Sequence, residues 1–205
     1  MFCKYDSKGG NKMANAEQVS LDEYFGVSTF PMNSPILEAV AKLATTNNHE
    51  ARGAIYTRFE VVEFILDLVG YKDEEKLFDK KILEPSFGDG DFLIPIVDRL
   101  ISSWKRHKEQ TSSIVEDLTD SMRAVELHKE TFHNTRESVL RKLIDAGVSS
   151  SEAKQLVGSW LIQGDFLLES QTEKFDYIVG NPPYLRQEAI PEALLKEYRL
   201  RYKTM

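Results

Sequence analysis

Cysteine is nearly absent from this sequence of 205 residues, since Cys3 is its single example. One cysteine excludes a disulfide within the chain and a cysteine-based zinc cluster, and it suits the reducing cytoplasm. Long apolar runs are also missing. None approaches the roughly 18 residues that a membrane-spanning helix needs, and the N-terminus has no apolar signal core. We therefore expect a cytoplasmic protein that has no bound metal and no membrane partner.

An excess of basic charge is the third absence. Lysine and arginine number 26 against 33 aspartate and glutamate residues, which gives a formal net charge of −7. A free-standing nucleic-acid clamp is normally basic, so that class is disfavoured, although an enzyme whose DNA-gripping part lies elsewhere stays open. The composition is otherwise that of a globular protein. We expect a mobile leader over residues 1–20, an N-terminal helical segment over 21–50 and a larger domain over 51–205.

Four short apolar segments predict β-strands, at about 81–85, 122–127, 160–163 and 175–180. They alternate with segments of helical periodicity, one of which follows Thr57 and another of which covers 191–205. This alternation predicts an α/β fold with a mostly parallel sheet. In such sheets the carboxyl ends of the strands meet at one edge, which is where ligands bind.

Acidic residues and glycines follow the first predicted strand. The string from Glu84 through Pro85 to Leu93 contains the turn Gly88-Asp89-Gly90, and then an apolar helical pattern begins. Glycines let the backbone approach a ligand closely, as in nucleotide-binding units. The carboxylates would repel a pyrophosphate, so NAD and ATP are disfavoured and a cationic ligand is favoured. A lone Gly-x-Gly would be weak evidence, but the whole string is much stronger.

The next two strand ends carry further candidates. Glu126 closes the second strand and is expected to accept hydrogen bonds from ribose hydroxyls, although an ordinary exposed glutamate is the alternative. After the third strand, Asp165 is placed to accept from an adenine amine and Phe166 to stack on its ring. A simple Gly-Asp turn is the competing interpretation there.

The fourth strand leads into a stiff turn, Asn181-Pro182-Pro183-Tyr184. Two prolines fix φ and remove two backbone donors, and Pro182 pushes Asn181 out of the helical region. The Asn side-chain oxygen and a proline-flanked carbonyl are then two acceptors suited to both hydrogens of an exocyclic amine. Tyr184 offers a flat face to a base swung out of a nucleic-acid stack. A purely structural turn capped by the Asn remains the alternative.

Upstream lies Gly53-Ala54-Ile55-Tyr56-Thr57. Thr57 is expected to be the N-cap of a helix with Glu60 as its capping-box partner, and Gly70 is expected to end that helix. The turn and the helix N-terminus could also meet a small anion such as a carboxylate. On this interpretation Tyr56 and Thr57 belong to the ligand site.

Together these motifs resemble those of the S-adenosylmethionine-dependent amino-methyltransferases, and the turn with Leu185 to Glu188 is similar to the Eco-type adenine-specific methylases that join modification and restriction in one polypeptide. The resemblance implies a Rossmann-like methyltransferase fold and transfer of a methyl group from S-adenosylmethionine to a flipped adenine in double-stranded DNA. It implies catalytic roles for Asn181 to Tyr184. It implies cofactor binding by Tyr56, Thr57, Glu84, Pro85, Gly88, Gly90, Glu126, Asp165 and Phe166.

The resemblance covers residues of roughly 50–190, and the sheet is expected to stop after its fourth strand. We therefore expect an incomplete catalytic domain over 51–205, with a second polypeptide as a possible source of the missing strands. Three alternatives stay open. They are a fragment that acts only with a partner chain, a protein-glutamine methyltransferase and an RNA adenine methyltransferase.

Overall fold

The computed structural model describes residues 34–45, 56–109, 113–169 and 173–202. The expected leader over 1–20, most of the segment over 21–50 and the residues Gly53 to Ile55 lie outside these ranges. In chain order the elements are α1 (Pro35–Ala44), α3 (Phe59–Leu68), the 3-10 turn η2 (Leu77–Asp79), β1 (Ile82–Glu84), α4 (Leu93–His107), α5 (Ile114–Leu118), β2 (Met122–Glu126), α6 (Lys129–Asp145), α7 (Ser150–Trp160), β3 (Leu161–Gln163), β4 (Tyr177–Ile178), η3 (Gln187–Ala189) and α8 (Glu192–Arg201).

Four parallel strands form one sheet in the order β3-β2-β1-β4. Ile82 of β1 lies opposite Met122 on one side and opposite Tyr177 on the other, which sets the register of the centre. The predicted α/β fold and all four predicted strands are confirmed, with shorter bounds. Trp160, predicted as the first residue of the third strand, instead ends α7, where its buried indole donates to the carbonyl of Leu118.

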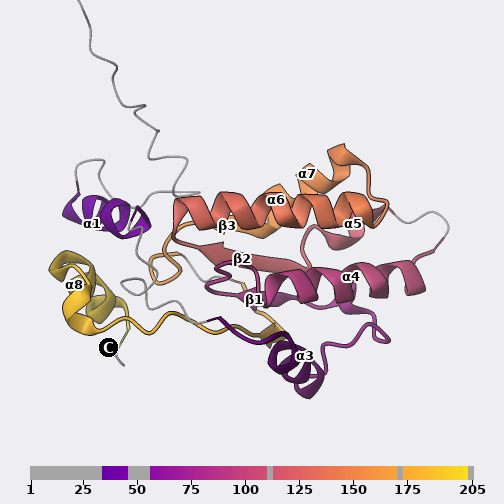
Figure 1. The fold of residues 1–205 in the computed structure, drawn as a ribbon, viewed down its shortest axis with the longest axis horizontal. Coiled ribbons are helices and arrows are strands. Elements are labelled where there is room, and N and C mark those ends of the chain that lie inside the picture. Colours follow the sequence, from indigo (N-terminus) through magenta and orange to yellow (C-terminus); the bar gives the residue numbers. More distant parts are fainter. Residues whose placement is uncertain (1–33, 46–55, 110–112, 170–172, 203–205) are drawn as a thin grey trace, which may run out of the picture.

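The main core lies on one face of the sheet. Side chains alternate between the faces along a strand, and Ile82, Met122 and Ala124 point into this core. Helices α3, α4, α5, α6 and α7 pack against it with their buried stripes, and Figure 1 shows α4 and α6 running alongside the strands. Burial of these apolar surfaces is the main contribution to stability. The sheet's carboxyl edge is thereby fixed by the packing of five helices.

The opposite face carries Leu83, Arg123 and Val125. Arg123 forms an ion pair with Glu173 in the connection from β3 to β4, and Lys81 also contacts this carboxylate. The connection therefore passes over this face on its way to β4. Leu83 and Val125 are buried on this face.

A second, smaller apolar cluster joins α1 to α8. It contains Leu37, Ala39, Val40, Leu168, Leu194 and Tyr198. Figure 1 shows the two helices side by side at one end of the molecule, beyond the sheet. Leu168 belongs to the turn that follows β3, so this helix pair is attached to the sheet at the exit of β3.

The start of α3 differs from its prediction. Thr57 is not the N-cap, because that position is taken by Arg58, which makes no side-chain capping bond, and the expected box with Glu60 does not form. The backbone N–H of Thr57 instead donates to Asp91 Oδ2 at 2.7 Å. Thr57 therefore contacts Asp91, 34 residues away in the chain, instead of the nearby Glu60. The other end is as predicted: the N–H of Gly70 donates to Asp67 and that of Tyr71 to Leu66, which is a Schellman closure.

Candidate active site

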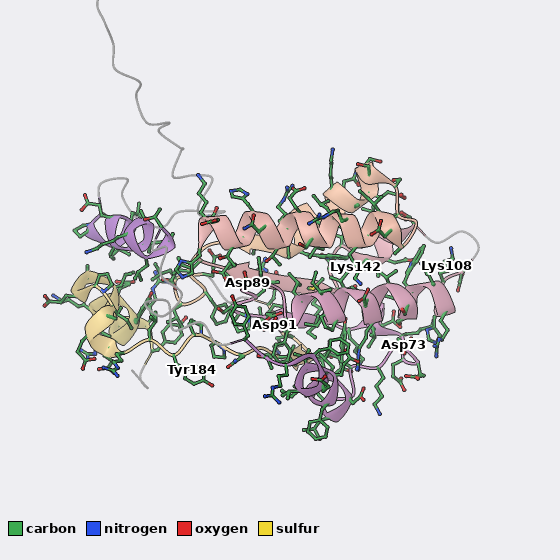
Figure 2. The ribbon with its side chains drawn as sticks, viewed as in Figure 1. Asp73, Asp89, Asp91, Lys108, Lys142 and Tyr184 are labelled. Carbon is green, nitrogen blue, oxygen red and sulfur yellow. The ribbon has the colours of Figure 1, made fainter. Side chains whose placement is uncertain are left out.

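A cavity opens at the carboxyl edge of the sheet. Four segments line it: the approach to α3, the turn after β1, the start of α6 and the chain after β4. The lining residues are Tyr56, Thr57, Glu84, Ser86, Phe87, Gly88, Asp89, Asp91, Phe92, Glu126, Leu127, His128, Thr131, Asn181, Pro183 and Leu185. Three of these segments follow strand ends, as expected for a parallel sheet. In Figure 2, Asp89, Asp91 and Tyr184 lie toward the end of the molecule that carries α1 and α8, away from Asp73 and Lys108.

Four carboxylates and no lysine or arginine line the cavity. Glu84 is the deepest of them, with 2% of its surface exposed, and its Oε2 atom has no hydrogen-bond partner. Burial raises the pKa of Glu84 well above its usual value, and the neighbouring charges of Glu126 and Asp91 raise it further. Such a site repels anions and would be stabilised by a cation near Glu84.

Glu126 is buried and fixed at both oxygens. Its Oε2 accepts the backbone N–H of Gly88 at 2.8 Å, and its Oε1 accepts that of His128 at 2.7 Å. The residue therefore joins the glycine turn after β1 to the N-terminus of α6. Because both contacts are to backbone donors, the carboxylate is held rigidly in the cavity wall.

The two glycines of the turn have different structural roles. Gly88 lines the cavity, has φ +51°, and a Cβ added there would meet nothing within 4 Å. Gly90 has φ +93° and lies outside the lining, and an added Cβ would lie 3.0 Å from Thr135 Cγ2. The Thr135 hydroxyl also donates to the carbonyl of Gly88 at 2.8 Å. Gly88 thus leaves the cavity wall open at this point, whereas Gly90 lets α4 pack against α6.

The proline turn contributes one side of the cavity. Asn181 and Pro183 line it, whereas Pro182 and Tyr184 face solvent, Tyr184 with 65% of its surface exposed. The side-chain amide of Asn181 donates to the Thr57 hydroxyl at 3.2 Å. Pro85 lies outside the lining, near Gly180, where an added Cβ would be 3.4 Å from its ring.

Asp165 and Phe166 do not reach the cavity wall. Asp165 is 5% exposed, and its carboxylate accepts from the Leu167 N–H at 3.0 Å and from the hydroxyl of Tyr198 in α8. Burial raises its pKa, against these two hydrogen bonds, which lower it. The structure therefore brings most of the predicted cofactor residues together but leaves this pair apart from them.

His128 is a cavity residue that the motifs of the sequence did not point to. It is half-buried and lines the cavity beside Glu126. Its position two residues after a strand-ending acid was the signal that could have placed it there. Within the described ranges no cluster of three or more His, Cys, Asp or Glu is arranged to hold a metal ion, and no helix is long and apolar enough to span a membrane.

Comparison with known proteins identifies the family. The model of the Eco57I restriction-modification methylase family matches residues 66–205. The Type II methyltransferase M.PaeR7I of Pseudomonas aeruginosa is 52% identical over 171 residues, which are 83% of this chain and 30% of the relative. M.XhoI of Xanthomonas vasicola is 46% identical over 156 residues, 76% of this chain and 29% of the relative. M.BstVI of Geobacillus stearothermophilus is 41% identical over 167 residues, which are 80% of this chain and 30% of the relative.

The match to these relatives therefore spans about 30% of their length. The family match, which begins at Leu66, includes the glycine turn, the strand-end acids and the proline turn. The chain belongs to the Eco57I restriction-modification methylase family.

Proposed function

We propose that this chain carries the cofactor site and the catalytic turn of an S-adenosylmethionine-dependent DNA methyltransferase that acts on the N6 amine of a flipped adenine. One observation carries the proposal: Asn181 lies on the wall of the same cavity as the buried carboxylates. A bound cofactor and a target amine would therefore meet at one point. A cytoplasmic location belongs to the proposal, because that is where bacterial DNA is.

The cavity suits the charge of this cofactor. S-adenosylmethionine carries an ammonium and a sulfonium, and it supplies the methyl group when bound. Glu84, with an unpaired buried oxygen, is the proposed partner of the ammonium. We assign the ribose to Glu126 and the close backbone approach to Gly88. The remaining proposed cofactor residues are Tyr56, Thr57, Pro85, Gly90, Asp165 and Phe166, of which Pro85 and Gly90 act by shaping the turn.

The chain's own residues then act on the target base. The Asn181 side-chain oxygen and the Pro182 carbonyl accept the two hydrogens of the amine, so they hold the nitrogen and stabilise the positive charge that develops on it. The ring of Tyr184, exposed beside the cavity, stacks on the base. Pro182 and Pro183 keep these acceptors rigid.

The edge of the sheet beside the turn motivates a second part of the proposal. Within the described chain β4 pairs only with β1, and Ile178 is 66% exposed. The neighbouring α3 exposes the rings of Phe59 and Phe64 and the side chain of Leu68. Such a strand edge and apolar surface favour pairing with further strands. We propose that methyl transfer to double-stranded DNA needs a further polypeptide segment here, including the DNA-gripping part.

The test is a chimera in which this chain replaces the matching 171-residue region of M.PaeR7I. The chimera is incubated with S-adenosylmethionine and DNA lacking methylated adenine, and the nucleosides are analysed by mass spectrometry. We expect N6-methyladenine, which Asn181→Ala should reduce by ~10²–10³ while cofactor binding remains. Parallel reactions on RNA and on protein substrates separate the alternatives. Methylation of either one, without methylation of DNA, would contradict the proposal.

A further inference from the structure

The carboxylate of Asp165 is enclosed by α8. It is 5% exposed, and Tyr198, which donates its hydroxyl to Oδ2, is 4% exposed. The other carboxylate oxygen accepts from the N–H of Leu167. Neither Asp165 nor Phe166 contributes to the wall of the acidic cavity. With α8 in place, Asp165 is therefore buried and lies outside the wall of that cavity.

Three side chains of the C-terminal region hold the turn after β3. Besides Tyr198, Arg201 donates from Nη1 to the carbonyl of Leu168 at 2.8 Å, and the Tyr202 hydroxyl donates to the carbonyl of Leu167 at 3.0 Å. Leu168 also packs with Tyr198 in the small cluster between α1 and α8. The helix is thus attached to the turn over residues 165–168 and to α1, rather than to the main core.

Tyr198 resembles the proposed ligand group in its chemistry. Burial raises the pKa of the Tyr198 hydroxyl, and the nearby Asp165 charge raises it further, so the hydroxyl keeps its proton at neutral pH. It is a single neutral donor directed at the carboxylate. The exocyclic amine of an adenine is also a neutral donor directed at a carboxylate in the proposed site. Because Asp165 is 5% exposed with the Tyr198 hydroxyl on Oδ2, an adenine amine would have to take the place of that hydroxyl to reach the carboxylate.

We propose that α8 is a cover over the adenine end of the cofactor site, in which Tyr198 competes with the adenine amine of the cofactor for Asp165. The inference rests on the proposed function, because that function assigns Asp165 to the adenine. Full engagement of the cofactor requires Tyr198 to release the carboxylate and the turn over 165–168 to open. Cofactor affinity is then set in part by the stability of the α8 contact.

The experiment compares Tyr198→Phe with the unsubstituted sequence in the M.PaeR7I chimera, using isothermal titration with S-adenosylhomocysteine. Phenylalanine keeps the ring in the small cluster and removes the competing donor. We expect binding to be roughly tenfold tighter, about 1.4 kcal/mol, close to the strength of a hydrogen bond to a charged group. Tyr202→Phe is the matched control. It removes a hydroxyl from the same region and the same turn but leaves the carboxylate contact, so its affinity should equal that of the wild type.

A second ligand shows whether the amine is responsible. The deaminated analogue, which carries hypoxanthine in place of adenine, lacks the exocyclic amine and should gain nothing from Tyr198→Phe. An equal gain for both ligands, or no gain for either one, overturns the inference. If the wild type binds and Glu84→Gln weakens that binding, the proposed cofactor site stands whatever Tyr198 does. If no variant binds S-adenosylhomocysteine, the inference and the cofactor assignment both fall.

A measurement on the unsubstituted M.PaeR7I chimera covers the case in which Tyr198→Phe does not fold. Hydrogen exchange is followed with and without S-adenosylhomocysteine. We expect the amides of α8 to exchange faster when the ligand is present, while those of the glycine turn from Gly88 to Asp91 exchange more slowly. Slower exchange in both segments would show that the ligand tightens α8, which contradicts its role as a cover.

Discussion

Asn181 and Thr57, 124 residues apart in the chain, are joined by a hydrogen bond of 3.2 Å from the side-chain amide to the hydroxyl. Thr57 is itself fixed, because its N–H donates to Asp91 Oδ2. The amide nitrogen of Asn181 therefore points at Thr57, and its oxygen points the other way. Under the proposed function, an amide in this orientation would present an acceptor rather than a donor to the target amine.

Thr57→Val should lower methyl transfer in the M.PaeR7I chimera by roughly tenfold to a hundredfold, since small misplacements of a catalytic group have effects of this size. Valine has nearly the shape of threonine but lacks the hydroxyl that orients Asn181. The cofactor dissociation constant should change little, because the backbone contact to Asp91 remains. Steady-state kinetics and titration check the two quantities separately.

Thr57→Ser is the control, because it restores the hydroxyl and should restore most of the turnover. Equal losses in the valine and serine variants would mean that Thr57 acts through packing. An unchanged rate in both would mean that the hydroxyl does not orient Asn181.

Alanine substitutions at the two glycines of the turn should lower the free energy of unfolding by different amounts. Gly88→Ala places a methyl group in open space and should cost about 1 kcal/mol for the left-handed backbone. Gly90→Ala adds a contact at 3.0 Å with Thr135 and should cost about 2–4 kcal/mol in total. Urea unfolding followed by circular dichroism measures both. A Gly88 variant that is less stable than the Gly90 variant would contradict the assigned roles.

The pKa of Glu84 predicts a pH dependence. Below the usual carboxyl pKa, Glu84 is protonated in both the folded and the unfolded chain, so it does not affect stability. Above that value the unfolded chain ionises first while the folded chain keeps its proton, because burial, Glu126 and Asp91 raise the folded pKa. The free energy of unfolding should therefore fall with rising pH, by up to about 1.4 kcal/mol per pH unit, until the pH exceeds the raised pKa.

Glu84→Gln removes this contribution, so the difference in unfolding free energy between wild type and variant should shift in favour of the variant as the pH rises. Taking the difference cancels the slope from Asp165, whose pKa is also raised. The same proton should be released when a cation binds, which calorimetry in buffers of different ionisation enthalpy detects. A difference that is independent of pH between the usual carboxyl pKa and neutrality would rule out this account.

The edge strand predicts self-association. We expect the chain by itself to be marginally stable and to aggregate, because β4 has no second partner strand among the described residues and Ile178 is 66% exposed. Ile178→Lys should shift the chain toward a monomer in analytical ultracentrifugation. Ile144→Lys, at an isoleucine that is 45% exposed on α6, is the matched control and should have no such effect. A wild-type chain that is monodisperse and melts cooperatively would contradict this prediction.

The sequence was sufficient for the features that depend on local pattern. Short runs of β-forming residues ended by Glu84 and Glu126 located the strands, and parallel topology then placed their ends at one edge. The sequence was not sufficient where a contact with a residue far away in the chain determines the local structure. Thr57 has the local signature of an N-cap, but Asp91 takes its N–H. The contact of Tyr198 with Asp165 could not be read from helical periodicity, because a stripe of apolar residues does not say which surface it covers.

The distance along the chain between β1 and β4 has a consequence for synthesis. Lys81, just before β1, donates its N–H to Asp176, 95 residues later, and β2 reaches the other side of β1 much earlier. At synthesis rates of about 5–20 residues per second this interval lasts about 5 to 20 s. Throughout it, a nascent chain exposes one edge of its central strand to the cell. The order of translation thus leaves that edge of β1 without the partner strand β4 until Tyr177 and Ile178 emerge from the ribosome.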